Sequence, residues 1–392
     1  MARPTVRRRR RAALAVATAA SLLLAAACDS GTQSGEIKIG FITATTGPVA
    51  FAGQTFGNGT QLAIDQLNQE DYLGGGRKIK LVKKEGAENP ARAVEQAKQL
   101  AGDQGVVGAI CCILSPVAGA VKPITSAAKL PLDIYGATDL GLEDPPYVVR
   151  TTTLPQDANR SLARKVVAQA KPASVAYAVT QDNSGWVSQL KSFQEGFAGT
   201  GVRDLGTVNT LAAQTDFSGA AGQLMAKNPE AVVIAALQQS SISLIKALRS
   251  RGYQGLIVTA ETIGSPGAFK AAGQTLADVP FPVYFFAGKA SAQGQKFAQS
   301  YKAKYGTDPD DYAAQGYMAA YMMATAAKNA GKDVTRESVT KALSNIKSLD
   351  GTIYGSVRFE NGQLHAPDSI VHITWTKDGR QTEWTPSGRS AS

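Results

Sequence analysis

Short, almost continuously apolar runs recur through most of this sequence and alternate with longer polar stretches. The runs are rich in Val and Ile and are only a few residues long. That combination is typical of strands that are buried on both faces of a parallel sheet. The predicted strands cover residues 37–43, 79–82, 106–110, 174–179, 231–237 and 256–258.

The segments between these runs place their apolar residues at helical spacing. In residues 56–67 the apolar positions fall on one face of a helix. A second helix is predicted to begin at Pro90, because proline is well tolerated in the first turn. Strand and helix alternate in this way over about 250 residues, which predicts a doubly wound α/β architecture.

The alternation pauses once, at residues 150–154, before Pro155 starts another helix. The 392-residue length exceeds what one such sheet needs and suits two domains. We therefore expect two α/β lobes, with the chain passing between them near residue 154.

Composition and charge exclude several classes of protein. Apolar residues make up 44% and charged residues 18%, an ordinary globular composition. The net charge of +10 falls to +4, from 35 basic and 31 acidic residues, once the six arginines of residues 1–27 are set aside. The rest of the chain has no basic run interleaved with aromatic residues, so nucleic-acid binding is not expected.

The N-terminus has the features of an export signal. Arg7–Arg11 precede a 16-residue apolar stretch, which is shorter than the roughly 20 residues of a membrane span. It ends in Leu24-Ala25-Ala26-Ala27-Cys28, which resembles the lipobox of bacterial lipoproteins. We predict a signal peptide over 1–27, lipidation of Cys28 and a flexible tether over 28–35. The alternative is an ordinary cleaved signal beside a free cysteine, and the sequence does not distinguish general secretion from twin-arginine export.

Catalytic and metal-binding patterns are missing from the sequence. The only two histidines, His365 and His372, have no partner at a metal-ligand spacing. There is no nucleophile elbow, P-loop or dinucleotide-binding fingerprint, and Asp308, Asp310 and Asp311 are better explained as the start of a helix. We expect no enzyme activity, catalytic residue, metal or cofactor. Two lobes without such chemistry predict reversible capture of a small polar ligand by hinge closure.

Several short motifs, in order along the chain, resemble the leucine/isoleucine/valine-type substrate-binding proteins of ABC importers. They are Ile37-Lys38-Ile39-Gly40, Thr46-Gly47-Pro48-Val49-Ala50, the helical segments 59–68 and 89–100, Gly136-Ala137-Thr138, Val149-Arg150-Thr151, Glu261 and the strand around 370–375. The resemblance implies a type I periplasmic binding fold, two doubly wound lobes joined by a hinge of three crossings. Lobe 1 would comprise 36–154 plus 288–355, and lobe 2 would comprise 155–287 plus 356–384.

The resemblance also implies ligand contacts. Thr138, with the backbone of Gly136, matches the segment that receives a ligand carboxylate, and Glu261 matches the partner of a ligand ammonium group. A strand-end cap and a hinge or surface ion pair are the respective alternatives. Ser184 stands where many members have Tyr, and Ala52 replaces an aromatic residue. Phe51 is the candidate to take over this role, together with Trp186, Leu237 or Gln238.

Adjacent Cys111 and Cys112 depart from the family pattern, because Cys112 matches a Ser that binds the ligand carboxylate. A thiol is a poorer donor, so this contact either weakens or passes to the backbone. The pair forms either a vicinal disulfide, which distorts the backbone, or two buried free thiols.

By this resemblance the protein is a lipid-anchored, monomeric capture subunit on the outer face of the cytoplasmic membrane. It would deliver an amino acid, branched-chain-like, or a similar small molecule to the membrane permease of an ABC importer. The alternative is a lipid-anchored sensor that passes its closed state to a membrane receptor, and the sequence does not separate the two.

Overall fold

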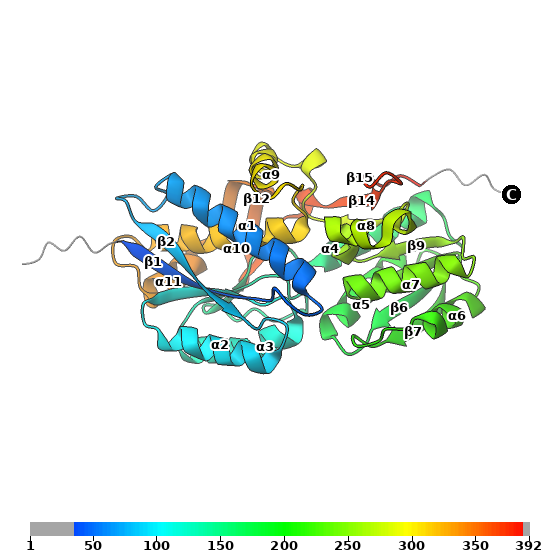
Figure 1. The fold of residues 1–392 in the computed structure, drawn as a ribbon, viewed down its shortest axis with the longest axis horizontal. Helices are drawn as coiled ribbons and strands as arrows, with labels where there is room; N and C mark the ends of the chain where they lie inside the picture. The colour runs from blue at the N-terminus through cyan, green and yellow to red at the C-terminus, as the bar shows by residue number, and fades with distance from the viewer. Residues whose placement is uncertain (1–34, 387–392) are drawn as a thin grey trace, which may run out of the picture.

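The computed structural model describes residues 35–386, which form two α/β lobes lying side by side (Figure 1). The predicted signal peptide, Cys28 and all but the last residue of the tether lie outside the described residues. Within the described part of the chain, no helix combines the length and apolarity needed to cross a membrane.

Lobe 1 is built on an eight-stranded sheet in the order β11-β12-β13-β5-β4-β3-β1-β2. The five strands from β1 to β5 run parallel, and β3 is buried along its whole length, as its apolar sequence predicts. The bounds are β1 Glu36–Thr43, β2 Lys78–Glu85, β3 Val106–Cys111, β4 Leu132–Ile134, β5 Val148–Arg150, β11 Ser348–Thr352, β12 Gly355–Glu360 and β13 Gln363–His365.

Helices cover both faces of this sheet, with α1 and α10 on one side and α2 and α3 on the other (Figure 1). The helices of lobe 1 are α1 Ala50–Gln69, α2 Pro90–Gly102, α3 Ser115–Ala127, α9 Ala292–Tyr305, α10 Asp311–Asn329 and α11 Arg336–Asn345. Two glycines let α1 and α10 touch through their backbones: a Cβ on Gly59 would lie 1.9 Å from the carbonyl oxygen of Ala313, and one on Gly316 would lie 2.1 Å from that of Phe56. The contact holds the middle of α1 against the first two turns of α10.

Lobe 2 contains a four-stranded parallel sheet in the order β7-β6-β8-β9, and it confirms the predicted strands in residues 174–258. The bounds are β6 Ser174–Thr180, β7 Arg203–Thr210, β8 Ala231–Ala235, β9 Leu256–Thr259, α4 Pro155–Gln169, α5 Ser184–Phe197, α6 Ser218–Ala226, α7 Gln238–Ser250 and α8 Pro266–Ala272. A small antiparallel sheet completes the lobe with β10 Phe281–Val283, β14 Val371–Trp375 and β15 Gln381–Glu383. Short 3₁₀ turns include Glu261–Gly264, Ala287–Lys289 and Pro367–Ser369.

The chain passes between the lobes three times, after β5, after β10 and after β13. The last crossing corrects the sequence-based division, which assigned residues 356–365 to lobe 2, because β12 and β13 both belong to the sheet of lobe 1. The reason is a long-range contact: Gln363 pairs with Arg150 on β5, and its amide oxygen accepts a hydrogen bond of 2.7 Å from the Arg150 guanidinium.

Candidate functional site

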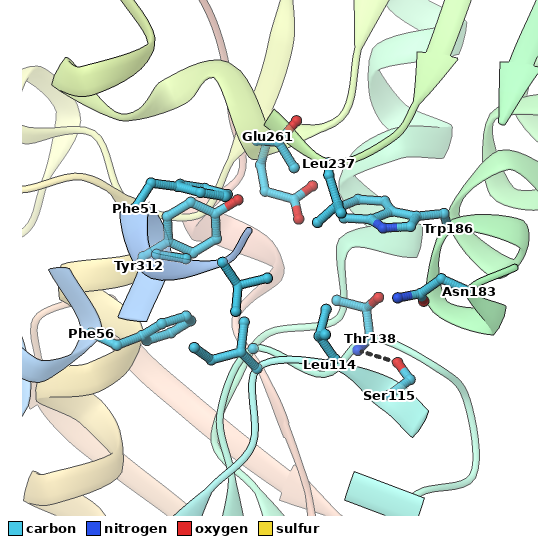
Figure 2. Close-up of a pocket in the computed structure, with 15 residues that line it drawn as sticks. Phe51, Phe56, Leu114, Ser115, Thr138, Asn183, Trp186, Leu237, Glu261 and Tyr312 are labelled. Carbon is cyan, nitrogen blue, oxygen red and sulfur yellow. Dashed lines mark hydrogen bonds between the residues drawn. The ribbon is translucent and has the colours of Figure 1, made fainter. Parts of the chain in front are cut away.

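A pocket lies between the lobes, beyond the carboxyl ends of the parallel strands (Figure 2). This is where open α/β sheets bind ligands, since strand-to-helix turns and helix N-termini converge there. Lobe 1 contributes Val49, Phe51, Ala52, Phe56, Ile113, Leu114, Ser115, Gly136, Thr138 and Tyr312, and lobe 2 contributes Asn183, Trp186, Leu237, Glu261 and Thr262.

Hydrogen-bond donors gather on one side of this pocket. The hydroxyl oxygen of Ser115, at the start of α3, accepts from the backbone N–H of Thr138 at 3.2 Å, so its own proton remains for a ligand (Figure 2). Asn183 caps α5 through its side-chain oxygen, which accepts from Gly185 at 2.9 Å and leaves the NH₂ group for other partners. The buried indole N–H of Trp186 has no partner among the described residues. Together with the Thr138 hydroxyl, these groups suit a carboxylate or another acceptor.

Glu261 supplies a carboxyl group from the opposite lobe. It begins the 3₁₀ turn after β9 and is 8% exposed. Its Oε1 accepts from the Gln189 amide at 3.4 Å, and its Oε2 is buried without a partner in the described chain. Burial raises the pKa of Glu261 to about 7, and the negative charge of Asp311 adds to the rise. A cation placed beside this carboxylate would offset the cost of burying it.

Two more buried carboxyls stand behind the pocket at the start of α10. Asp310 caps the helix by accepting from the backbone N–H of Ala313 at 2.8 Å, which confirms the predicted helix start. Asp311 accepts from the backbone N–H groups of Tyr284 and Phe285 at 3.1 and 2.8 Å, and so ties α10 to the second crossing. Burial raises the pKa of Asp310 to about 7 and that of Asp311 to about 6.

The remaining wall is aromatic and apolar. The ring centroids of Phe51 and Phe56 lie 5.8 and 5.3 Å from that of Tyr312, and Leu237 and Trp186 face them from lobe 2 (Figure 2). Such a wall accommodates the hydrocarbon part of a ligand, while the donors and Glu261 orient its polar ends.

The pocket brings together four of the predicted site residues: Phe51, Gly136, Thr138 and Glu261. Gly136 has a different role from the predicted backbone donor, because its N–H already donates to the Thr152 hydroxyl at 2.7 Å. Its φ of +83° and the Phe56 ring, 2.9 Å from where a Cβ would be, require glycine there.

Ser184 was predicted in the site but does not line the pocket. It is exposed at the first position of α5, and its neighbours Asn183 and Trp186 face the ligand space instead. The helix phase explains the difference, because successive residues of a helix point in different directions. Of the other candidates, Gln238 does not line the pocket either, and its amide donates to Thr262 and Ser265.

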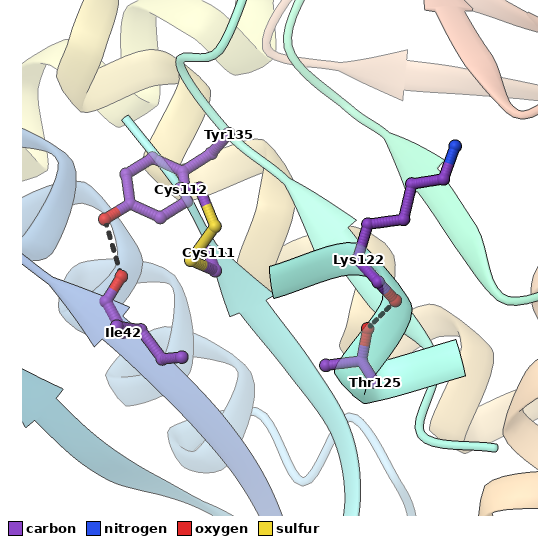
Figure 3. The surroundings of a disulfide bond; sticks show 6 residues. All are labelled: Ile42, Cys111, Cys112, Lys122, Thr125 and Tyr135. Atoms are coloured by element: carbon purple, nitrogen blue, oxygen red, sulfur yellow. Dashed lines mark hydrogen bonds between the residues drawn. A yellow bond between two sulfur atoms is a disulfide. The ribbon is translucent and has the colours of Figure 1, made fainter. Parts of the chain in front are cut away.

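Cys112 is a wrong prediction as a ligand contact. Its sulfur is bonded to that of Cys111 in a vicinal disulfide (Figure 3). Both side chains are fully buried, and neither residue lines the pocket. The backbone carbonyls of Cys111 and Cys112 accept from Tyr135 at 2.9 Å and Ala137 at 3.2 Å. The pair therefore anchors the loop that leads to Thr138.

Four residues that form or support the site were not predicted from the sequence: Tyr312, Ser115, Asn183 and Arg150. Arg150 is fully buried on β5, and its guanidinium donates to the carbonyl oxygens of Ala137 at 2.9 Å and Asp139 at 2.8 Å. It also forms an ion pair with Glu143. Arg150 thus holds the Thr138 loop in place. The available sequence signal was a charged residue at the end of an apolar strand.

The part of the chain that the structure describes contains no cluster of three or more His, Cys, Asp or Glu residues able to hold a metal ion.

Comparison with known proteins gives consistent matches over most of the chain. The family model described as periplasmic binding protein matches residues 36–380. The Leu/Ile/Val-binding protein homolog 7 of Brucella abortus (strain 2308) is 24% identical over 392 residues, covering 92% of this chain and 94% of the relative.

Two solved structures share the fold. The branched-chain amino acid transporter substrate-binding protein LivJ of Streptococcus pneumoniae, in complex with isoleucine, has a TM-score of 0.79 at 22% identity, covering 90% of this chain and 100% of the other. An ABC transporter solute-binding protein of R. palustris, in complex with 4-hydroxybenzoate, also has a TM-score of 0.79, at 19% identity, covering 90% and 96%. Proteins of this fold therefore hold ligands both with and without an ammonium group.

Proposed function

Since the chain belongs to the periplasmic binding protein family, whose members bind solutes and are not enzymes, we propose that it captures an amino acid with an apolar side chain between its two lobes. It has the type I fold of that family, with two parallel-sheet lobes and three crossings. In this proposal the amino acid is handed to the permease of an ABC importer.

The observation that carries the proposal is the unpartnered Oε2 of Glu261 in the same pocket as four donors. A buried carboxylate without a cation is costly, and a ligand ammonium group would remove that cost. The donors around Thr138 suit the ligand carboxylate, and the wall formed by Phe51, Phe56 and Leu237 suits an aliphatic or aromatic side chain. An acid without an ammonium group would leave the Glu261 side of the pocket unmatched.

We further propose that residues 1–27 direct export and that lipidated Cys28 anchors a monomer to the outer face of the cytoplasmic membrane. The arginine run, the short apolar stretch and the small residues before Cys28 support this part of the proposal. The tether would let the lobes reach a permease in the same membrane.

A thermal-shift screen tests the ligand class. Ligand at 100 times its Kd stabilises the folded state by about 2.7 kcal/mol, which is several degrees in melting temperature. We expect L-leucine, L-isoleucine, L-valine or L-phenylalanine to raise the melting temperature, and their amides and deaminated acids to fail. A shift with 4-hydroxybenzoate and none with any amino acid would contradict the proposal and point to an aromatic acid.

A further inference from the structure

A second cavity, of about 330 Å³, lies at the hinge and shares no lining residue with the ligand pocket. Its walls come from the second crossing, within residues 284–291, and from residues 368–372, which end the third crossing and begin β14. Lys165 of α4 and Glu383 of β15 line it from lobe 2, and Ile353 and Tyr354 line it from lobe 1. Anything bound there would contact both lobes.

The charges around this cavity are not evenly matched. Lys289 is paired with Glu383 at 2.8 Å, and Asp368 is exposed to water. Lys165 is half-buried and makes no ion pair within residues 35–386, and its ammonium group lies 5.6 Å from the centre of the Trp384 ring. Burial lowers the pKa of Lys165, against the opposing effect of Glu383. Lys165 is therefore the charged group around this cavity that would gain most from an oppositely charged ligand.

Two buried neutral groups in the same walls also lack partners. The hydroxyl of Tyr354, a residue only 6% exposed, and the Nε2 of His372 make no hydrogen bond to any described residue. Burial and the nearby charge of Lys165 lower the pKa of His372 to about 4, so its ring is neutral at pH 7. The phenol of Tyr354 carries one donor. The single N–H of the neutral His372 ring interacts with the backbone of Ala158, so the unpartnered Nε2 is an acceptor. Buried polar groups are normally satisfied, so unpartnered ones in a cavity indicate a ligand or ordered water.

We propose that the hinge cavity binds a small anion, a carboxylate or phosphate-type oxyanion, through the Lys165 ammonium and the Tyr354 hydroxyl, with the His372 ring beside it. Lys165 and His372 belong to lobe 2 and Tyr354 to lobe 1, so the bound anion joins the lobes. It therefore favours the lobe angle that brings these groups together. This site is separate from the proposed amino-acid pocket and does not depend on the identity of the ligand there.

Ring NMR of the two histidines tests the site directly, because the chain contains only His365 and His372. The His365→Gln variant assigns the signals. Sodium acetate and sodium phosphate are titrated separately at pH 7, with sodium chloride added to keep ionic strength constant. We expect the His372 signals to shift saturably and the His365 signals to stay. Whichever salt saturates at lower concentration defines the class of anion.

Variants distinguish specific anion binding in the cavity from general charge screening. Lys165→Gln should weaken anion binding at least tenfold, Lys165→Arg should restore most of it, and Tyr354→Phe should weaken it about threefold. Lys98→Gln removes the same charge from the exposed face of α2 and should change nothing. Shifts without saturation, or equal shifts in the wild type and Lys165→Gln with both folded by circular dichroism, would overturn the proposal.

Small-angle X-ray scattering of the wild-type protein tests the bridging role. Saturating anion should change the radius of gyration, and the same addition to Lys165→Gln should not. Saturable binding with an unchanged radius of gyration would overturn the statement that the anion sets the lobe angle.

Discussion

Amino-acid binding should strengthen as the pH rises from 5 to 8, because the ligand ammonium group competes with a proton for Glu261. The carboxyl is buried, its Oε2 has no partner in the described chain, and its pKa lies at about 7. A cation held against it favours the ionised form and returns the pKa toward its ordinary value. The ligand therefore binds the form with ionised Glu261, and binding releases a proton from those molecules in which Glu261 was protonated.

The size of the effect follows from the fraction of Glu261 that is ionised. With a pKa of about 7, that fraction is about one half at pH 7 and about one hundredth at pH 5. The apparent Kd scales inversely with the competent fraction, so affinity should fall about 100-fold between pH 8 and pH 5. If the pKa in the complex returns to the ordinary 4.5, the coupling is on the order of 3 kcal/mol.

Isothermal titration calorimetry measures both the Kd at each pH and the number of protons released on binding. Titrations in buffers of different ionisation enthalpy give the protons released, about one half per ligand at pH 7. Glu261→Gln should bind at least thirtyfold more weakly at pH 8, since losing one partner of a buried charge pair costs about 2 to 5 kcal/mol. It should also lose the pH dependence.

Asp310 provides the matched control. Its pKa is also raised to about 7, but it does not line the pocket. Asp310→Asn should therefore keep the pH dependence of binding. The reasoning fails if the wild-type Kd is flat from pH 5 to 8, or if Glu261→Gln still releases the same fraction of a proton.

Four further predictions concern anchoring, the disulfide, stability and packing. Cys28→Ala should move the protein from the membrane fraction to the soluble fraction, and unchanged fractionation would refute lipid anchoring. The vicinal disulfide predicts a mature mass about 2 Da below that of the reduced chain and no thiol that titrates after denaturation, whereas two titratable thiols would contradict it. Burial raises the pKa of Asp133 to about 8, so the native state binds more protons than the unfolded chain. The stability that protonated Asp133 contributes should be fully present below pH 4, and the free energy of unfolding should fall by a few kcal/mol as the pH rises to 8. Urea unfolding should find this pH dependence reduced in Asp133→Asn. Gly59→Ala should lower the free energy of unfolding by about 1 to 3 kcal/mol, because its Cβ would meet the Ala313 carbonyl oxygen at 1.9 Å, while Gly119→Ala on α3, with nothing within 4 Å, should be neutral or slightly stabilising.

The sequence by itself determined the parts of this protein that depend on local pattern. A run such as residues 106–110 is apolar throughout because both faces of β3 are covered, and this can be read without knowing its neighbours. Pro90 begins α2, with Asn89 accepting from the backbone of Ala91, for equally local reasons. Alternation of such elements leaves few topologies other than a doubly wound sheet.

The sequence predicted only part of the site, because a local pattern does not determine which side chains face the pocket. Thr138 and Glu261 follow strands at positions where polar side chains stand out, and both line the pocket. Ser184 differs from Asn183 by one residue, and only the phase of α5 decides which of them faces the ligand space. Resemblance to other sequences fixed the region but not the face of the helix.

Only the tertiary structure decided which distant segments meet. Tyr312 reaches the pocket because α1 and α10, more than 200 residues apart, pack through two glycines, and no local pattern records that contact. The sheet that receives β13 is set by its pairing with Arg150, and Cys112 leaves the site because its sulfur bonds to its neighbour. The physical reason is that hydrophobic period and capping depend on residues within a few turns of one another. Strand pairing, the burial of charged groups and the shape of a cavity depend on long-range contacts that exist only after the chain has folded.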